Sequence, residues 1–335
     1  MRYAAKLLIG LLILALVLQF VDIRAAMLAL RDVRIEWVLA SVACYVATRV
    51  LQALKWWIWI GGSNSPTSYP TVQRAMCLAD YYGLLFPNSL AVDVLRVTLM
   101  RHHAGGIAQL SAGVLADRVT NVALTALVSL VAIAVAWIVQ GALPFTAAVT
   151  GAVLTVVGIV FAACVVLASP RLMGVAFSLL DGLARLMPRV AIVRRVLAGG
   201  RQVQLAMMAM LTSRRTLVPG VALGLMLVLA RVGSTYFLFH AVGAPQPFVL
   251  TLMLVPVITL IVLIPISILG LGVKEGAFVF FFGGAGVAAI HAVGVSLVSY
   301  VVIIASTLVL GLLASVIGPP LPSRSEMPRE SSTDG

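Results

Sequence analysis

Six long apolar runs constrain the fold of this chain more than any other feature of its sequence. They cover residues 7–21, 38–60, 111–137, 147–168, 220–242 and 292–316. A helix needs about 20 mainly apolar residues to cross a bilayer, and in lipid the backbone N–H and C=O groups must find their partners within the protein. The sequence therefore predicts an all-α, polytopic membrane protein with about six full spans.

The first run, residues 7–21, follows Arg2 and Lys6 and so looks like the start of a secretory signal peptide. Such a peptide ends in a cleavage site of the A-x-A type. No convincing site of this type precedes Asp22. We therefore expect residues 7–21 to be a retained first helix.

The composition excludes several classes of protein. The chain has 335 residues, of which 62% are hydrophobic and 10% charged, whereas a soluble domain has about 25% charged residues. A soluble enzyme, a disordered chain and a nucleic-acid-binding domain are excluded, so no nucleic acid is expected as a partner. The three cysteines lie far apart in apolar runs, and the four histidines lack the spacing of metal ligands. No metal or other cofactor is therefore expected.

The positive charge is concentrated in one segment. Residues 169–219 contain eight arginines and a single acid, Asp181, and supply most of the formal net charge of +12. Because Lys and Arg gather in cytoplasmic loops, we expect this segment and both termini on the cytoplasmic side of the inner membrane. Residues 1–318 are predicted to form one transmembrane domain, and residues 319–335, rich in Pro, Ser and Glu, a disordered tail.

Within this segment, residues 175–186 and 190–211 alternate apolar and basic residues at helical spacing. This pattern is typical of amphipathic helices that lie on the anionic lipids of the inner leaflet. The alternative is a solvated, positively charged loop.

Two further apolar regions are interrupted. Residues 71–100 are broken by Pro87-Asn88-Ser89, and residues 249–290 by Pro265-Ile266-Ser267 and the glycines Gly270 and Gly272. Each half is too short to span the membrane, and such punctuation is typical of re-entrant helices. The positive-inside rule is satisfied if the first hairpin enters from the cytoplasm and the second from the opposite face.

The two breaks also match each other in register. Pro87 and Ser89 correspond to Pro265 and Ser267, and a cation, Arg96 or Lys274, follows each proline by nine residues. Interrupted helices in corresponding halves indicate an inverted repeat and a transporter's binding site; a chance match is the alternative. A helix that begins inside the membrane directs free N–H groups at an anion such as a phosphate.

Charged residues inside spans are costly and mark cavities or partners. Asp80, Asp93, Arg96, Lys274 and Glu275 lie near the breaks, and Asp117 and Arg118 lie seven to eight residues into the span 111–137. Asp93 and Arg96 share one helix face and are expected to pair at i, i+3. The alternative to a binding role is that these groups are structural ion pairs. Arg49, Lys55 and Arg231 also lie within spans, and Lys55, in a tryptophan-rich stretch, is expected to snorkel to the membrane interface.

Three ordered motifs resemble the lysylphosphatidylglycerol synthase transmembrane-domain family. They are Leu85-Phe86-Pro87-Asn88-Ser89 through Asp93-Val94-Leu95-Arg96, Leu115-Ala116-Asp117-Arg118, and Pro265-Ile266-Ser267-Ile268-Leu269-Gly270-Leu271-Gly272-Val273-Lys274-Glu275-Gly276. The chain departs from the family pattern at Ala91 and Val92, near the usual glycine, and at Leu269, where the first of two glycines is expected. The resemblance covers about residues 5–318 and implies a stand-alone member without the aminoacyltransferase domain that bifunctional members carry.

The resemblance implies a lipid flippase that moves a phosphate-headed lipid, either a polyprenyl-phosphate-linked sugar or a glycerophospholipid. Site roles follow from it together with the charges at the breaks. Arg96, Lys274 and Arg118 are expected to hold the phosphate, with Asn88, Ser89 and Ser267 as hydrogen-bond donors at the hairpin tips. Asp93, Asp117 and Glu275 are expected to orient these cations and to carry protons. Asp80 is expected to pair with a charge or to couple protons.

Two other functions are also compatible with this sequence. The protein could be a non-transporting scaffold that assists a glycosyltransferase or a lipid-modifying enzyme. A membrane enzyme acting on lipid phosphates is weaker, because no nucleophile or metal cluster is visible in the sequence, and we expect no catalytic residue.

Overall fold

The computed structural model describes residues 33–62, 67–84, 89–101, 106–140, 146–169, 190–263 and 271–317, with residues 174 and 178 in isolation. These residues form ten helices and no strand. In chain order they are α3 (Ile35–Trp59), α4 (Tyr69–Gly83), α5 (Ser89–Met100), α6 (Ile107–Gln140), α7 (Ala147–Ala168), α9 (Val190–Thr212), α10 (Arg214–Ala241), α11 (Phe248–Val262), α12 (Val273–Gly283) and α13 (Ala289–Val316). The all-α prediction is confirmed.

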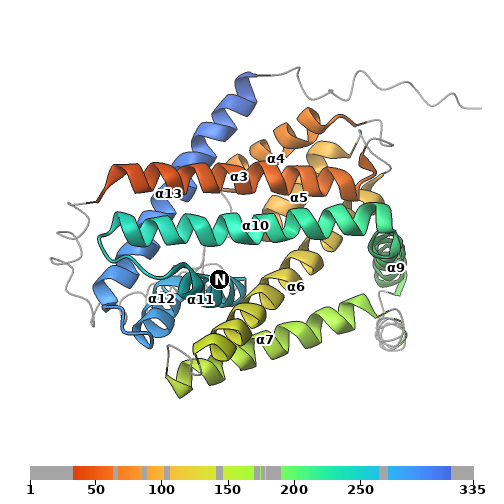
Figure 1. Cartoon of the computed structure of the whole chain (residues 1–335). Coiled ribbons are helices and arrows are strands. Elements are labelled where there is room, and N and C mark those ends of the chain that lie inside the picture. The colour runs from red at the N-terminus through yellow and green to blue at the C-terminus, as the bar shows by residue number, and fades with distance from the viewer. Residues whose placement is uncertain are drawn as a thin grey trace, which may run out of the picture.

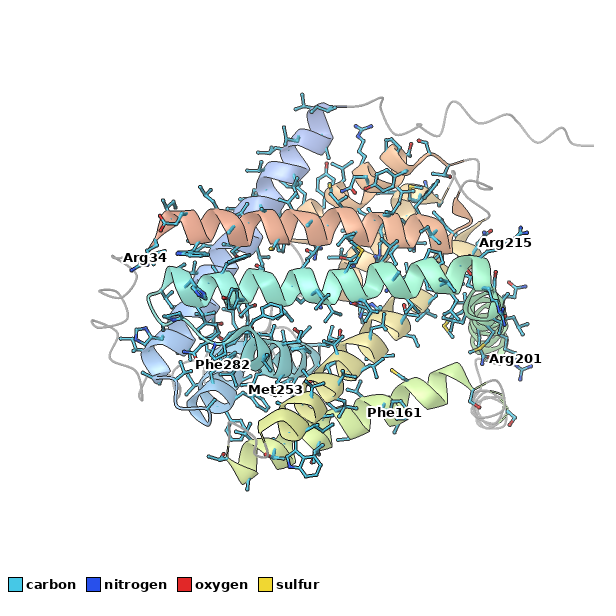
Figure 2. The ribbon with its side chains drawn as sticks, in the orientation of Figure 1. Arg34, Phe161, Arg201, Arg215, Met253 and Phe282 are labelled. Atoms are coloured by element: carbon cyan, nitrogen blue, oxygen red, sulfur yellow. The ribbon has the colours of Figure 1, made fainter. Side chains whose placement is uncertain are left out.

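Five helices, α3, α6, α7, α10 and α13, are long and apolar enough to cross a membrane. They confirm five of the six predicted spans; residues 7–21 lie outside the described residues. Large apolar side chains remain exposed on their outer faces, among them Trp137 on α6, Phe161 on α7 and Val309 on α13. Figure 2 shows Phe161 on the outer helix α7. Such a surface is stable in lipid, so the chain is a multi-pass membrane protein.

Helices α3 and α10 run antiparallel through the centre of the molecule, side by side in Figure 1. At one end, the N–H of Arg34 donates to the carbonyl of Ala241 at 3.1 Å. At the other end, Gly220 lies so close to Trp59 that an added Cβ would be 2.6 Å from the ring. A glycine is required at this contact because a larger residue would separate the helices.

The first interrupted region forms a hairpin of α4 and α5, which pack against each other. Thr67, just before α4, accepts a hydrogen bond from Trp57 Nε1 at 2.9 Å. Met100, at the end of α5, packs in one apolar cluster with Trp56 and Ile60. Both outer ends of the hairpin therefore lie at the end of the molecule where α3 terminates.

The second interrupted region forms a hairpin of α11 and α12. Near the end of α12, the ring of Phe282 lies 4.5 Å from that of Phe239, close to the end of α10, and Gly284 accepts from the N–H of Thr146 at 3.3 Å. This hairpin enters from the end opposite to the first, as predicted. Gly272 precedes α12 with φ +80°, a left-handed conformation that suits glycine at the predicted break. The two loops, residues 85–88 and 264–270, lie outside the described residues.

The helix packing is symmetric when the two halves are exchanged. Helix α4 packs against α13, and its counterpart α11 packs against α6; likewise α5 packs against α6 and α12 against α13. Because the equivalent helices α3 and α10 are antiparallel, the two halves are related as an inverted repeat. The match between the two breaks in the sequence therefore corresponds to a repeat in the fold.

The arginine-rich segment is described from residue 190 onward. Its second predicted amphipathic helix is present as α9, while residues 175–186, apart from residue 178, lie outside the described residues. Met207 and Met210 of α9 are buried against Ala112 and Ala116 of α6. Part of the apolar face of α9 thus packs on the protein itself, and its contact with anionic lipid stays a prediction.

Candidate functional site

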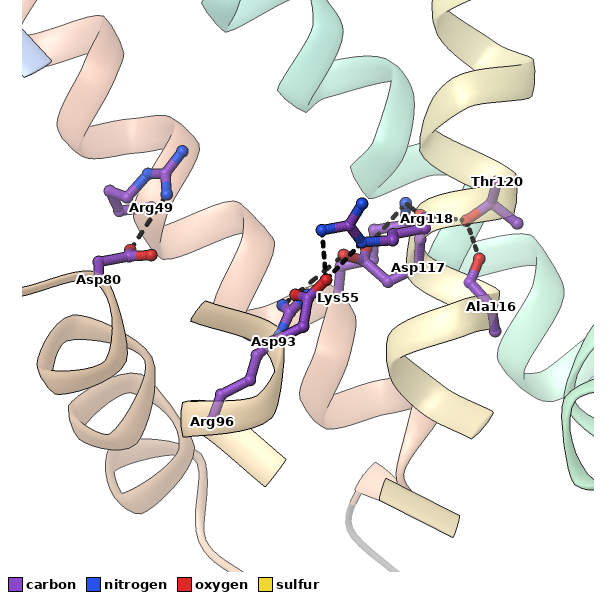
Figure 3. Close-up of polar contacts among 9 residues, drawn as sticks. All are labelled: Arg49, Lys55, Asp80, Asp93, Arg96, Ala116, Asp117, Arg118 and Thr120. Carbon is purple, nitrogen blue, oxygen red and sulfur yellow. Dashed lines mark hydrogen bonds and ion pairs between the residues drawn. The ribbon is translucent and has the colours of Figure 1, made fainter. Parts of the chain in front are cut away.

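Five charged side chains meet where the first hairpin packs against α3 and α6. This central cluster consists of Lys55 from α3, Asp93 and Arg96 from α5, and Asp117 and Arg118 from α6 (Figure 3). Asp93 and Arg96 lie one turn apart on α5. Because residues three apart on a helix face the same side, the hairpin can present both groups to the neighbouring spans.

Asp93 connects the hairpin to α6. One carboxylate oxygen of Asp93 accepts from Arg96, and the other accepts from Nε and Nη2 of Arg118. The predicted i, i+3 pair of Asp93 and Arg96 is therefore confirmed. The same carboxylate orients both guanidinium groups, so a substitution of Asp93 would remove a contact from Arg96 and from Arg118 at once.

Asp117 connects α6 to α3. Its Oδ1 lies 3.1 Å from Lys55 Nζ, and its Oδ2 lies 4.0 Å from Arg96 Nη1. Lys55 has no exposed side-chain surface, so the prediction that it snorkels to the interface is wrong. The neighbouring Trp56 and Trp59 are themselves buried, because they face α6 and α10 rather than the headgroup layer.

Exposure differs sharply across the central cluster. The side chains of Arg96 and Asp117 are each 4% exposed, whereas Arg118 is 34% exposed. Arg96 also lies over the ring of Trp56, with its Cζ 5.6 Å from the ring centroid. The cluster contains three cations and two carboxylates, so it is net positive, and Arg118 is its most accessible cation.

The second hairpin has its own charged pair at the start of α12. Glu275 accepts from the N–H of Gly272 at 2.6 Å and from the hydroxyl of Ser296 at 3.1 Å, and it is fully buried. The ammonium of Lys274 contacts the hydroxyl of Ser299 and lies 4.2 Å from the ring centroid of Tyr300. Each hairpin therefore places one cation over an aromatic ring of a spanning helix.

A third charged group lies apart from the central cluster in Figure 3. Arg49 of α3 donates to Asp80 of α4 at 3.1 Å, and its guanidinium lies 5.0 Å from the ring centroid of Tyr45. The Tyr45 hydroxyl is 3.1 Å from the hydroxyl of Thr307 on α13. Asp80 thus has the charge-pairing role that was predicted for it, with a partner that the sequence did not indicate.

A family model described as lysylphosphatidylglycerol synthase TM region matches residues 3–313. The chain belongs to this family. The match covers nearly the whole chain, and it identifies a multi-pass membrane protein of a family connected with membrane lipids. Neither the curated proteins nor the solved structures give a match to this chain.

The structure brings some of the family's motif residues together and separates others. The central cluster unites Asp93, Arg96, Asp117 and Arg118, which come from the first two motifs. Within the described part of the chain, no hydrogen bond or ion pair links Lys274 to that cluster. Ser89 begins α5. The other predicted tip residues lie outside the described residues: Pro87, Asn88, Pro265, Ser267 and Gly270.

Sequence reasoning missed Lys55 as a member of the central cluster. The available signal was a lysine deep inside the predicted span 38–60, which has to find an anionic partner if it cannot reach the interface. Among the described residues, no group of three His, Cys, Asp or Glu side chains is arranged to hold a metal ion. The chemistry of this site is therefore that of guanidinium, ammonium and carboxylate groups.

Proposed function

We propose that the protein is a lipid flippase that moves an anionic, phosphate-headed lipid across the cytoplasmic membrane. The lipid is a polyprenyl-phosphate-linked sugar or a glycerophospholipid. The proposal rests on one observation: a net positive cluster, built from a re-entrant hairpin and two spans, inside a membrane protein of a lipid-related family.

The charge balance supports an anionic head group. Burying an unneutralised cation is costly, so an excess of cations inside spans is stable when an anion can approach it. Arg118 is the accessible cation of the cluster, and a guanidinium binds a phosphate with two parallel hydrogen bonds. In this proposal Arg118 makes the first contact, and Arg96 and Lys274 complete the phosphate site between the hairpins.

The carboxylates serve to orient the cations in this proposal. Asp93 fixes the planes of Arg96 and Arg118, and Asp117 positions Lys55. When phosphate arrives, the Asp93–Arg118 contact competes with the Arg118–phosphate contact, so binding is reversible. Transport requires this reversibility, because a lipid that binds too tightly is not released.

The test is lipid translocation by the purified full-length protein in liposomes. Fluorescent phosphatidylglycerol and a fluorescent polyprenyl-phosphate sugar are supplied separately, and a membrane-impermeant quencher reports the fraction in the outer leaflet. We expect Arg118→Gln to slow translocation of the transported lipid about tenfold or more, because a hydrogen bond to a charged group contributes about 1.5–3 kcal/mol. Arg215→Gln, at an exposed position, is the matched control.

Two outcomes contradict the proposal. The first is a folded Arg118→Gln protein that transports at the rate of the unchanged protein. The second is an unchanged protein that moves neither lipid, which is the result expected of a scaffold for a glycosyltransferase or lipid-modifying enzyme. Protein-free liposomes measure the spontaneous rate in both cases.

A further inference from the structure

The crossing of α3 and α10 lies at the centre of the inverted repeat. Ser41 and Ser234 are in contact through hydroxyls 2.8 Å apart, and Trp59 contacts Gly220 farther along the pair. Halfway between these two contacts, α3 is near residue 50 and α10 near residue 227. The sequence offset between the two halves that aligns Arg96 with Lys274 also aligns residue 50 with residue 228. The repeat axis therefore passes through this crossing.

Two arginines flank the crossing. Arg49 on α3 lies directly at it, and Arg231 on α10 lies about one helical turn from it. Substrate sites in inverted-repeat transporters lie near the bilayer midplane, at the interface of the repeats. Arg49 and Arg231 are therefore at the depth and interface where such a site is expected.

The charges around this crossing do not balance among the described residues. Asp80 is the carboxylate that contacts Arg49, whereas the guanidinium of Arg231 has no ion pair or hydrogen bond within that part of the chain. Arg231 interacts electrostatically with the like charge of Arg49 and with Asp117. Asp117 already has Lys55 and Arg96 as neighbours, so it does not neutralise a third cation.

Buried polar atoms near the crossing also lack partners. They include two donors, Nε of Arg49 on α3 and Oγ of Ser306 on α13. Ser306 is 6% exposed and adjoins Thr307, which contacts Tyr45. Unpaired buried donors cost free energy, and an N–H and a hydroxyl are both groups that an anionic oxygen can accept from.

We propose that Arg49 and Arg231 form an anion-binding site at the repeat interface, which takes the phosphate of the lipid head group midway through its transfer. This inference rests on the proposed function. The central cluster and this site are connected along α3, where Arg49 and Lys55 are six positions apart, or about 9 Å of helix. The phosphate moves between two cationic sites over a distance comparable to the size of a head group.

The test measures binding rather than transport. The melting temperature of the full-length protein in detergent is followed while phosphatidylglycerol, inorganic phosphate or diacylglycerol is added. Phosphatidylglycerol is expected to raise the melting temperature, and diacylglycerol, which lacks phosphate, is not. A shift with inorganic phosphate alone identifies free phosphate, rather than a lipid head group, as the source of the anion; either source supports the site if the shift depends on Arg231.

Variants at three positions decide whether the crossing binds the anion. Arg231→Gln is expected to raise the ligand concentration at half-saturation about tenfold. Asp80→Asn, which frees Arg49, is expected to lower that concentration. Arg215→Gln, an exposed arginine of the same helix, is the control. If Arg231→Gln does not fold, Arg231→Lys keeps the charge but loses the paired donors, and a threefold weakening is expected.

The inference is overturned if Arg231→Gln and Asp80→Asn change the melting temperature without ligand but leave half-saturation unchanged, which is the result of a purely structural role. Its failure is distinguishable from that of the proposed function. Transport that is unaffected by Arg231→Gln refutes the site alone, whereas Arg231-dependent binding without any transport refutes the flippase.

Discussion

Lys55 and Asp117 place opposite charges where almost no solvent reaches either side chain. Their side chains are 0% and 4% exposed, and the shortest distance between their charged atoms is 3.1 Å. Lys55 Nζ also lies 3.4 Å from the backbone carbonyl of Asp117. Because both partners are desolvated, the pair fixes α3 against α6 and is sensitive to the loss of either charge.

Replacing Lys55 by methionine, which has a similar length and no charge, is expected to lower the free energy of unfolding by about 3–5 kcal/mol, because Asp117 loses its nearest cation. Reversible unfolding in mixed detergent micelles measures this change. The double variant Lys55→Met with Asp117→Asn removes both charges and is expected to regain part of the loss. Equal losses in the single and double variants would show that the unpaired charge of Asp117 is not the cause of the loss.

The contact between Asp93 and Arg96 was predictable from the sequence alone. The spacing of Asp93 from Arg96 is sufficient to predict a shared helix face, and the contact is present. The contact with Arg118 joins residues 25 positions apart and depends on how α5 packs against α6. Local pairs are therefore predictable from spacing, whereas pairs between helices require the packing itself.

At the scale of elements, the α3–α10 pair depends on small residues. A Cβ added to Gly220 would lie 2.6 Å from Cζ2 of Trp59, which is 1% exposed and has little room to move. A Cβ added to Gly233, on the same helix, would meet only Cys44 Sγ, at an ordinary contact distance of 3.5 Å. The two glycines form a matched pair that separates packing from helix propensity.

Gly220→Ala is expected to lower the free energy of unfolding by about 1–3 kcal/mol, because the helices have to move apart. Gly233→Ala is expected to be neutral, or to raise stability by up to about 1 kcal/mol, because alanine favours the helix. Melting temperatures in one detergent compare the two variants directly. Equal effects at both positions would mean that the close approach at Trp59 does not determine stability.

The spans and breaks were predictable because their signal is local. Apolar runs required by the membrane gave α7 with the predicted bounds 147–168, and prolines and glycines marked the interruptions that separate α4 from α5 and α11 from α12. The partners of Arg49 and Lys55 were not predictable, since Asp80 and Asp117 lie 31 and 62 positions away. Three tryptophans near Lys55 favoured a position at the membrane interface, but tryptophan also occurs in protein cores. The burial of Lys55, Trp56 and Trp59 in the structure shows that this stretch is part of the core.

At the scale of the molecule, basic residues gather at one end. Arg201 on α9 and Arg215 on α10 lie at the end where α9 meets α10, and Arg34 lies at the opposite end (Figure 2). Arg201 and Arg215 belong to the arginine-rich segment, and Arg215 is exposed. The positive-inside rule therefore predicts that this end faces the cytoplasm.

Cysteine labelling tests this orientation in a background without Cys44, Cys77 and Cys164. We expect a membrane-impermeant maleimide to label Glu36→Cys, near Arg34, in intact cells. Arg215→Cys is expected to react only after the membrane is permeabilised. Both residues are exposed at helix ends, so their intrinsic reactivities are comparable. The reverse labelling pattern would place the arginine-rich end outside and refute the predicted topology.

The central helix pair also has a consequence for how the protein is made. The hydroxyl contact between Ser41 and Ser234 joins residues separated by 193 positions. At a synthesis rate of about 5–20 residues per second, α3 enters the membrane roughly 10–40 seconds before α10 emerges from the ribosome. During that interval Arg49 can pair with Asp80, and Lys55 with Asp117, because these acids are translated earlier. The order of the acids along the chain thus allows the cations of α3 to be neutralised before α10 arrives.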